Sequence, residues 1–224
     1  MSDDALDELL LTRRRLSSRT CIMRNDAHDI TLGQLAEVRP GHPFRGGIPE
    51  VPQGEVRVIQ IGDLSRDGLN SCERLLRTSL EARKPPDWLR DQDVLLVARG
   101  AHSYAVCLDE VPPMVVCSPH LYVVRVKQQH RLLPAFLAWQ LNQGPAQRYL
   151  RQSAEGSHQL SIRRSVLELL PIRLLSLAHQ QRAVAMESTA RQERVVLTRL
   201  IEHREAQLAG IAEQLLDPSC RNTQ

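Results

Sequence analysis

The sequence predicts an α+β protein in which one globular domain, built of mixed strands and short helices, is followed by a single long helix. Between residues 56 and 126 the apolar residues form short runs typical of strands, whereas after residue 134 they recur at helical spacing. From about Ser176 to Leu216 there is no proline and only one glycine, Gly210. A helix of about forty residues would be roughly 60 Å long at 1.5 Å per residue. Because a small domain is narrower than that, part of the helix must project.

Strands are expected where a short apolar run lies between turn residues. Val56–Ile61 is one such run, and Asp93–Ala98 has the continuous apolar character of a buried strand. The stretch Arg39–Gly47 contains two prolines and three glycines and is predicted to be an irregular loop. Further strands are predicted at 104–108, 114–117 and 120–126.

Shorter helices are expected at both ends of the globular domain. Residues 2–19 begin acidic and end basic, which suits the helix dipole. A helix at 134–142 would have Pro134 in its first turn, where proline is tolerated, and another is predicted at 145–152. Ser161 is expected to cap a further helix that ends before Pro171.

The long helix carries apolar residues at alternating three- and four-residue steps, as in a coiled coil, with one interruption at Arg204. This pattern predicts a surface for a second helix, although a helix packed on its own domain is the alternative. The seam residues are Leu197, Ile201, Arg204, Leu208, Ile211 and Leu215.

Composition limits the classes of protein that need be considered. With 42% hydrophobic and 25% charged residues, the chain can form a packed core, and a formal net charge of +3 permits a nucleic-acid partner without requiring one. No apolar run approaches the roughly 20 residues that span a bilayer, so no membrane is expected. Acidic residues come before Arg13–Arg15, the reverse of a secretory signal, which predicts a cytoplasmic protein.

The cysteines do not predict a metal site. The nearest approach to a ligand set is Cys107, Cys117 and His120, which lacks the short Cys-x-x-Cys spacing of structural zinc sites. Five scattered cysteines are expected to be reduced thiols.

Motifs of catalysis are missing from the sequence. It contains no phosphate-binding Gly-x-x-x-x-Gly-Lys loop, no Gly-x-Gly-x-x-Gly turn, no His-Glu-x-x-His pair and no Gly-x-Ser-x-Gly elbow. Asp91, Asp93 and Arg99 lie around a strand as in metal-dependent nucleases, but the lysine expected near the second acid is absent. A protein without catalysis and without a cofactor is therefore expected.

Polar, flexible segments favour a binding function instead. Arg99–Tyr104 directly follows a predicted buried strand, Arg39–Arg45 lies in a glycine-rich loop, and His158–Arg164 precedes a predicted helix. Arginine and glutamine side chains can contact both phosphates and base edges. The candidate DNA-binding residues are Arg39, His42, Arg45, Arg99, His102, Ser103, Tyr104, His158, Gln159, Arg163 and Arg164.

The segment Leu170–Val184 resembles the end of a target-recognition domain in the specificity subunits of type I restriction-modification systems. There a leucine-proline-isoleucine strand leads into a glutamate-glutamine-arginine helix start. Similar elements precede it in the family's order: Ile30–Gly41, Val58–Leu64, Leu89–Arg99 and Gly156–Leu160. Leu175 stands where the family has a second proline, and Gln92 where it has glycine.

The resemblance implies four segments: an N-terminal helix and linker (1–29), a target-recognition domain (30–175), a long dimerisation and docking helix (176–217) and a tail (218–224). A full specificity subunit has two recognition domains and two long helices, so this chain resembles half of one. A homodimer through antiparallel long helices is therefore expected, with an interrupted palindrome as its target.

The resemblance further implies three partners: double-stranded DNA, an adenine-specific methyltransferase subunit that supplies the chemistry, and a restriction motor-nuclease subunit that can join them. Arg191, Arg194 and Arg199 are candidate contacts to these subunits. Two alternatives stay open: a stand-alone decoy or regulator derived from such a subunit, and a scaffold in which the helix acts without DNA.

Overall fold

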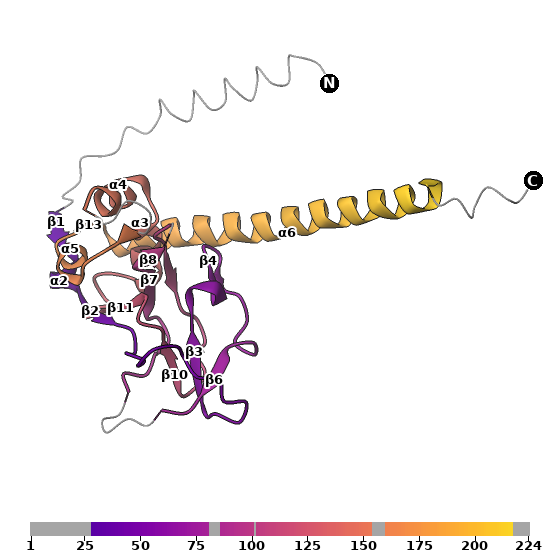
Figure 1. Ribbon diagram of the computed structural model, residues 1–224. Helices are drawn as coiled ribbons and strands as arrows, with labels where there is room; N and C mark the ends of the chain where they lie inside the picture. Colours follow the sequence, from indigo (N-terminus) through magenta and orange to yellow (C-terminus); the bar gives the residue numbers. More distant parts are fainter. Residues whose placement is uncertain (1–27, 81–85, 101, 154–159, 217–224) are drawn as a thin grey trace, which may run out of the picture.

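The computed structural model of the protein describes residues 28–80, 86–100, 102–153 and 160–216. The strands and shorter helices form a head, and helix α6 (Leu177–Leu216) begins on this head and extends far beyond it (Figure 1). The expected α+β fold with one long C-terminal helix is confirmed. The helix expected at 2–19 lies outside the described residues.

The centre of the head is a four-stranded sheet of order β2-β11-β7-β9, antiparallel throughout. Its strands are β2 (Ala36–Pro40), β11 (Leu121–Val126), β7 (Val94–Val97) and β9 (Ala105–Cys107). All four residues of β7 are buried. Val94 and Leu96 face one hydrophobic core and Leu95 and Val97 a second, which explains why this strand has no polar alternation.

A second sheet has the order β10-β3-β6 and extends the head away from α6 (Figure 1). Strand β3 (Val56–Ile59) pairs in parallel with β10 (Val115–Cys117) and antiparallel with β6 (Leu76–Thr78). A short 3-10 turn, η1 (Ile61–Asp63), follows β3. The predicted strands at 56–61, 104–108, 114–117 and 120–126 are present in shorter form.

Three pairs of short strands connect distant parts of the chain. They are β1 (His28–Thr31) with β13 (Pro171–Leu174), β8 (Arg99–Gly100) with β12 (Leu160–Ser161), and β4 (Leu64–Ser65) with β5 (Gly68–Leu69), each antiparallel. The β1–β13 pair joins the first described strand to the strand that leads into α6. Sequence patterns did not predict β1, β4, β5, β6, β8 or β12.

The larger of the two hydrophobic cores, which Val94 and Leu96 face, is called the main core here. Four short helices cover it: α2 (Leu32–Leu35), α3 (Pro134–Leu141), α4 (Gly144–Ser153) and α5 (Arg164–Glu168). Phe136 and Leu137 of α3 are fully buried in that core. Pro134 occupies the first turn of α3 as predicted, since a proline there gives up no hydrogen bond.

Two local predictions were wrong. Ser161 does not cap a helix, because it belongs to β12; α5 begins at Arg164, and its N-cap Arg163 makes no side-chain capping bond. Arg39 and Pro40 are not in a loop but end strand β2. Proline is tolerated there because β2 is an edge strand, where an amide on the open side has no partner to lose.

Helix α6 is attached to the head along its first half, and most firmly at its start. The Gln180 side chain is buried and makes three hydrogen bonds: its oxygen accepts from Leu133 N at 2.8 Å, and its nitrogen donates to Arg131 O at 2.7 Å and to Leu175 O at 2.8 Å. An amide can accept and donate together, so this one residue fixes the starts of both α3 and α6. From residue 192 onward every residue of α6 except Gly210 is exposed.

Candidate nucleic-acid interface

The predicted recognition segments leave the central sheet at one of its ends. Because neighbouring strands are antiparallel, β2 and β7 end where β11 and β9 begin: Pro40 lies opposite Tyr122, and Val97 opposite Leu121. Backbone bonds tie both loops to the start of β11, from Gly41 N to Leu121 O (2.9 Å) and from Ala98 N to His120 O (3.0 Å). Segments far apart in sequence therefore converge.

The third predicted segment joins this end through the β8–β12 pair. Ser161 lies directly opposite Arg99, and Ile162 N donates to Ala98 O at 3.0 Å. The Tyr122 hydroxyl donates to Ile162 O at 3.1 Å and anchors the segment to the sheet. We call the segments 41–46, 98–104, 118–120 and 160–164 the loop edge; residue 101 within it is not described.

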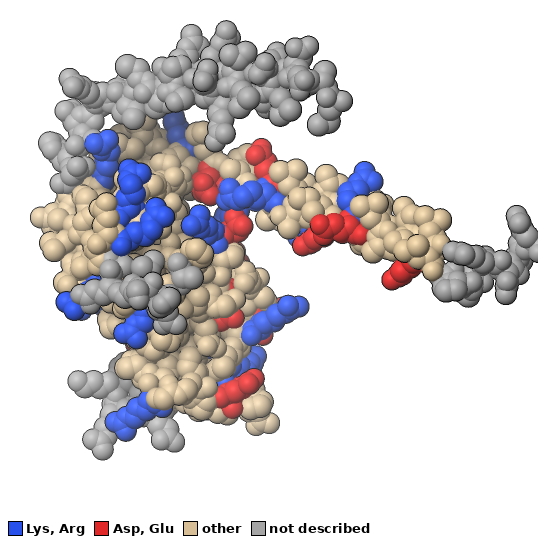
Figure 2. All heavy atoms as spheres, turned by 45° about the horizontal axis from the view of Figure 1, so that its top comes forward, with Lys and Arg blue, Asp and Glu red and all other residues tan. Residues whose placement is uncertain are grey.

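Arg45, Arg99 and His102 are the most available side chains of the loop edge. All three are exposed, and within the described part of the chain none has a hydrogen bond or ion pair. Figure 2 shows Lys and Arg side chains gathered on the upper left of the head, with few Asp or Glu among them. Such exposed guanidinium groups are suited to phosphates and to guanine edges.

Arg163 and Arg164 are also exposed, but Arg164 forms an ion pair with Glu168 at 2.8 Å, one helical turn away. Exposed pairs of this kind contribute little stability, so a phosphate can compete for the guanidinium. His158 and Gln159 lie outside the described residues.

Three predicted contacts are not free at the surface of the head. The Tyr104 hydroxyl donates to Leu64 O at 2.8 Å, and the Ser103 hydroxyl is buried without a hydrogen-bond partner among the described residues. Arg39 bonds the carboxylates of Glu37 and Asp87 at 2.6 and 2.7 Å. The bond from Arg39 lowers the pKa of Glu37, so this pair stays charged. DNA would have to displace an existing partner to bind Arg39.

His42 is held in a tight corner of the loop edge. Its backbone N–H donates to Cys117 O at 2.8 Å, and its ring packs edge-on against Phe44, with 4.8 Å between ring centroids. Burial lowers the pKa of His42, which favours a neutral ring that can both donate and accept a hydrogen bond. The preceding Gly41 is required, since a Cβ there would lie 2.0 Å from Ser118 O.

The acidic residues at the other end of β7, away from the loop edge, are already bound. Asp93, with a side chain only 2% exposed, pairs with Arg125 at 2.6 Å. Asp91 accepts from Val111 N at 2.6 Å. The two carboxylates that could suggest a nuclease therefore stabilise the fold, and no group of three or more metal-ligand side chains occurs in the described residues.

Sequence reasoning missed His120 as a member of the loop edge. It is exposed, and its carbonyl oxygen holds the Arg99 loop. The available signal was the Pro119-His120 step directly before a buried strand.

None of the described helices has the length and apolar character needed to cross a membrane.

No protein-family model and no curated protein matches the sequence. Among solved structures, the S subunit of a type I restriction-modification system from M. genitalium matches 89% of this chain, with 16% identity and a TM-score of 0.57. The HsdS subunit from Thermoanaerobacter tengcongensis matches 98% of it, with 18% identity and a TM-score of 0.59. A chain from a structure of type I restriction-modification complex assembly and conformational transition matches 96%, with 19% identity and a TM-score of 0.62.

The chain has the fold of a type I restriction-modification specificity subunit. The resemblance that begins with Leu170–Val184 is thus confirmed at the level of the fold. The match covers 49%, 52% and 56% of the three solved chains, so this chain spans about half of their length. The head contains the segment predicted to be a recognition domain, and α6 lies in the segment predicted to be a docking helix.

Proposed function

We propose that this protein recognises a specific DNA sequence for a type I restriction-modification complex and carries no catalysis of its own. The observation that carries the proposal is the specificity-subunit fold, shared over 89–98% of the chain. The loop edge would read DNA, with Arg45, Arg99 and His102 as its exposed contacts. Arg163 and Arg164 would add phosphate or base contacts from the adjoining segment.

The projecting part of α6 supports pairing with a second copy. Its apolar seam residues are more than half exposed: Leu197 57%, Ile201 58%, Leu208 66%, Ile211 52% and Leu215 74%. A row of large apolar side chains on an isolated helix is expected to be covered by another helix.

The seam is symmetrical about Ala206, as any run of alternating four- and three-residue steps of this length is, and it is compatible with an antiparallel pair. With a two-fold axis at Ala206, Leu197 of one copy lies opposite Leu215 of the other, and Ile201 opposite Ile211. Arg204 then lies opposite Leu208. Every layer joins an a position to a d position, as antiparallel coiled coils require. Among the flanking positions, Thr198, Leu200, Glu205, Gln207, Ala212 and Gln214, only one carries a charge.

Such a dimer would hold two identical heads at a fixed separation, so the target would be an interrupted palindrome. The helix pair, with Arg199 and neighbouring exposed residues, would be the docking surface for an adenine-specific methyltransferase subunit. That subunit would bring the methyl donor and the reaction, and a motor-nuclease subunit would join the same complex.

The first test is the solution mass of the purified chain by light scattering, alone and with a candidate methyltransferase subunit. We expect a mass near twice 25.3 kDa that grows when the partner is added. A monomer that ignores the partner would overturn the dimer and favour the decoy or scaffold alternatives.

The second test is selection from a pool of random DNA duplexes by the complex. An enriched interrupted palindrome is expected, and Arg99→Ala should reduce its enrichment at least about fivefold, since one lost base or phosphate contact is worth about 1–3 kcal/mol. Arg182→Ala, which removes an exposed arginine of α6 outside the loop edge, is the matched control. Equal enrichment by both variants would exclude the loop edge as the reader.

A further inference from the structure

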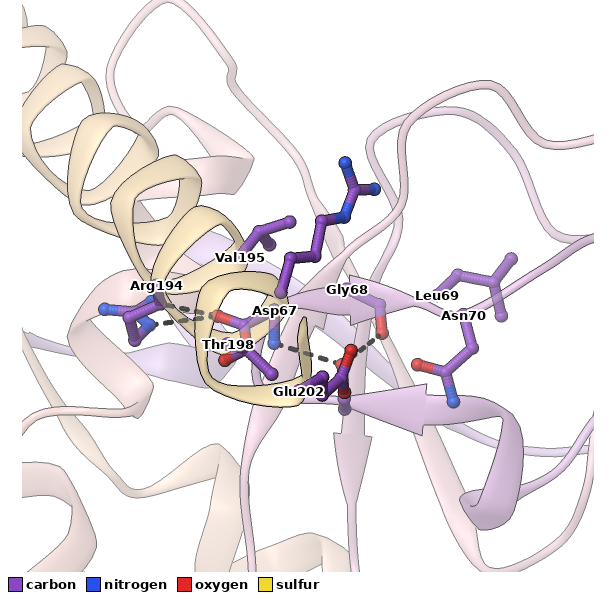
Figure 3. Close-up of a pocket in the computed structure, with 10 residues that line it drawn as sticks. Asp67, Gly68, Leu69, Asn70, Arg194, Val195, Thr198 and Glu202 are labelled. Carbon is purple, nitrogen blue, oxygen red and sulfur yellow. Dashed lines mark hydrogen bonds and ion pairs between the residues drawn. The ribbon is translucent and has the colours of Figure 1, made fainter. Parts of the chain in front are cut away.

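The β4–β5 hairpin contacts α6 at the point where the helix leaves the head (Figure 3). Asp67, at the turn of the hairpin, accepts hydrogen bonds on its carboxylate from Arg194 Nε at 3.2 Å and Nη2 at 3.0 Å. Its backbone oxygen accepts a third bond from Arg191 at 3.2 Å. Arg194 also bonds Glu187 at 3.0 Å, which holds its guanidinium in place between two carboxylates. No later residue of α6 has a hydrogen bond to the head among the described contacts.

The hairpin is itself fixed to the head. The Tyr104 hydroxyl donates to Leu64 O, and Asn70 N donates to Asp63 O at 2.9 Å. Leu64 is buried in the second core, and Leu69 packs against it. The turn depends on Gly68, whose φ of +132 disfavours any side chain. A continuous path of contacts therefore runs from the sheet through Tyr104 and Asp67 to α6.

Apolar packing does not determine the angle of the helix at this junction. A hollow of about 440 Å³ lies between the hairpin and the helix, lined by Leu69, Asn70, Val195 and Thr198 among others. A second hollow of about 300 Å³, lined by Cys107, Trp139, Val184 and Ser188 among others, lies between the head and the earlier turns. Gln180, Ala183 and Val184 hold the earlier turns against the head, and beyond them the directional bonds to Asp67 are the described contacts that resist tilting.

A small tilt at this junction has a large effect at the far end of the helix. From Arg194 to Leu216 α6 extends about 33 Å at 1.5 Å per residue, so a tilt of about 10° moves its tip by about 6 Å, close to two base-pair steps of about 3.4 Å. In a dimer with its two-fold axis at Ala206 the lever from Arg194 is about 18 Å, so the same tilt shifts each head by about 3 Å relative to the axis and the two heads together by about 6 Å.

We propose that the β4–β5 hairpin is a brace that fixes the angle between head and helix, and that Asp67 is a positioning residue for spacer length. The inference rests on the proposed function: the loop edge selects the bases of each half-site, whereas the brace decides how many base pairs separate the half-sites. Loosening the brace should leave base preference intact and broaden the range of accepted spacers.

The test compares Asp67→Asn and Arg194→Gln with Glu193→Gln, which removes an exposed charge from the same turn without a partner in the described structure. Each chain, in complex with the methyltransferase subunit, selects duplexes from a library that contains the enriched half-sites with spacers of random length. Wild type and Glu193→Gln should enrich one spacer length. Both brace variants should enrich the same half-sites with two or more spacer lengths. A single unchanged spacer in the brace variants would overturn the inference while the proposed function stands.

A distance measurement separates failure of the brace from failure of the proposed function. Spin labels are placed at Glu73 on the head and at Gln207 on α6, in a chain without native cysteines that is diluted with unlabelled protein. Asp67→Asn should at least double the width of the distance distribution relative to Glu193→Gln. If wild type enriches no interrupted site, the proposed function fails. An unchanged width overturns the brace in either case.

Discussion

Arg125 binds the buried carboxylate of Asp93 through both Nε and Nη2, at 2.7 and 2.6 Å. This pair joins β11 to the segment before β7, and Asp93 also accepts from Arg90 N at 2.9 Å. Removing Arg125 leaves the buried Asp93 carboxylate without a counter-charge, whereas removing the Asp93 charge leaves Arg125 paired with Asp87 at 3.4 Å. Arg125→Met should therefore lower the free energy of unfolding by about 3–5 kcal/mol, and Asp93→Asn by less, measured by urea denaturation. Arg90→Met removes an exposed arginine with no side-chain bond and should change stability by less than about 0.5 kcal/mol. Equal losses of unfolding free energy in the Arg125 and Arg90 variants would show that the Arg125–Asp93 pair does not stabilise the fold.

Gly41 is the point at which the chain passes closest to another segment. A Cβ at this position would lie 2.0 Å from Ser118 O, whereas a Cβ at Gly47 would meet nothing within 4 Å. Gly41→Ala should destabilise the head by about 1–3 kcal/mol and displace the His42 loop, because the backbone must move apart. Gly47→Ala should be close to neutral. The unfolding temperatures of both variants, compared with that of the wild type, test this prediction. A Gly41→Ala variant as stable as the wild type would contradict the close approach of Gly41 to Ser118.

Gln92 occupies a position that suits glycine. Its φ is +66, a left-handed conformation that costs a residue with a side chain roughly 1–2 kcal/mol. Gln92→Gly should raise the unfolding free energy by up to about 1 kcal/mol once the larger backbone entropy of glycine is subtracted. Gln92→Ala removes the same polar group but keeps a Cβ, so it should not stabilise. If both Gln92→Gly and Gln92→Ala are stabilised, the cause is the loss of the Gln92 side chain and not the relief of its positive φ.

Arg204 is the one charged residue in the seam of α6. It bonds Gln207 at 3.0 Å and leaves Leu208 of the second copy without an apolar side chain opposite it. Arg204→Leu should strengthen self-association at least tenfold in sedimentation equilibrium, and it should also permit helix pairs in other registers, because a polar seam residue specifies register at a cost in stability. Arg199→Leu, outside the seam, is the control. Weaker association of Arg204→Leu would contradict the pairing about Ala206.

Burial raises the pKa of the Cys107 and Cys117 thiols to about 12. Both are therefore protonated at pH 8, and iodoacetamide should modify the partly exposed Cys72 well before Cys117, as peptide mapping by mass spectrometry would show. In the unfolded chain these thiols ionise near pH 8.5, so their contribution to stability is present below that pH and is lost as the pH rises toward 12. Equal rates of modification in the native protein would contradict the burial of Cys117.

Several elements follow from local sequence alone. The proline-free stretch after Ser176 determines α6, because a long run of helix formers needs no distant partner. The apolar run Val94–Val97 determines a buried strand, and Pro134 marks the start of α3. Symmetry of the seam about Ala206 is also a property of the sequence, since it depends only on the order of residue types.

Tertiary structure decided the elements that depend on distant partners. Strands of two or three residues, such as β8 and β12, exist only because each pairs with the other, so Ser161 entered a strand instead of capping a helix. The loop edge forms because antiparallel strands turn at the same end of a sheet, which no single segment encodes. Arg39 at the end of β2 and Arg99 just after β7 are the same residue type, yet one is ion-paired and the other exposed. That difference was decided by where Glu37 and Asp87 lie in the folded head, because the range of a hydrogen bond is a few ångströms in space and is independent of separation along the chain.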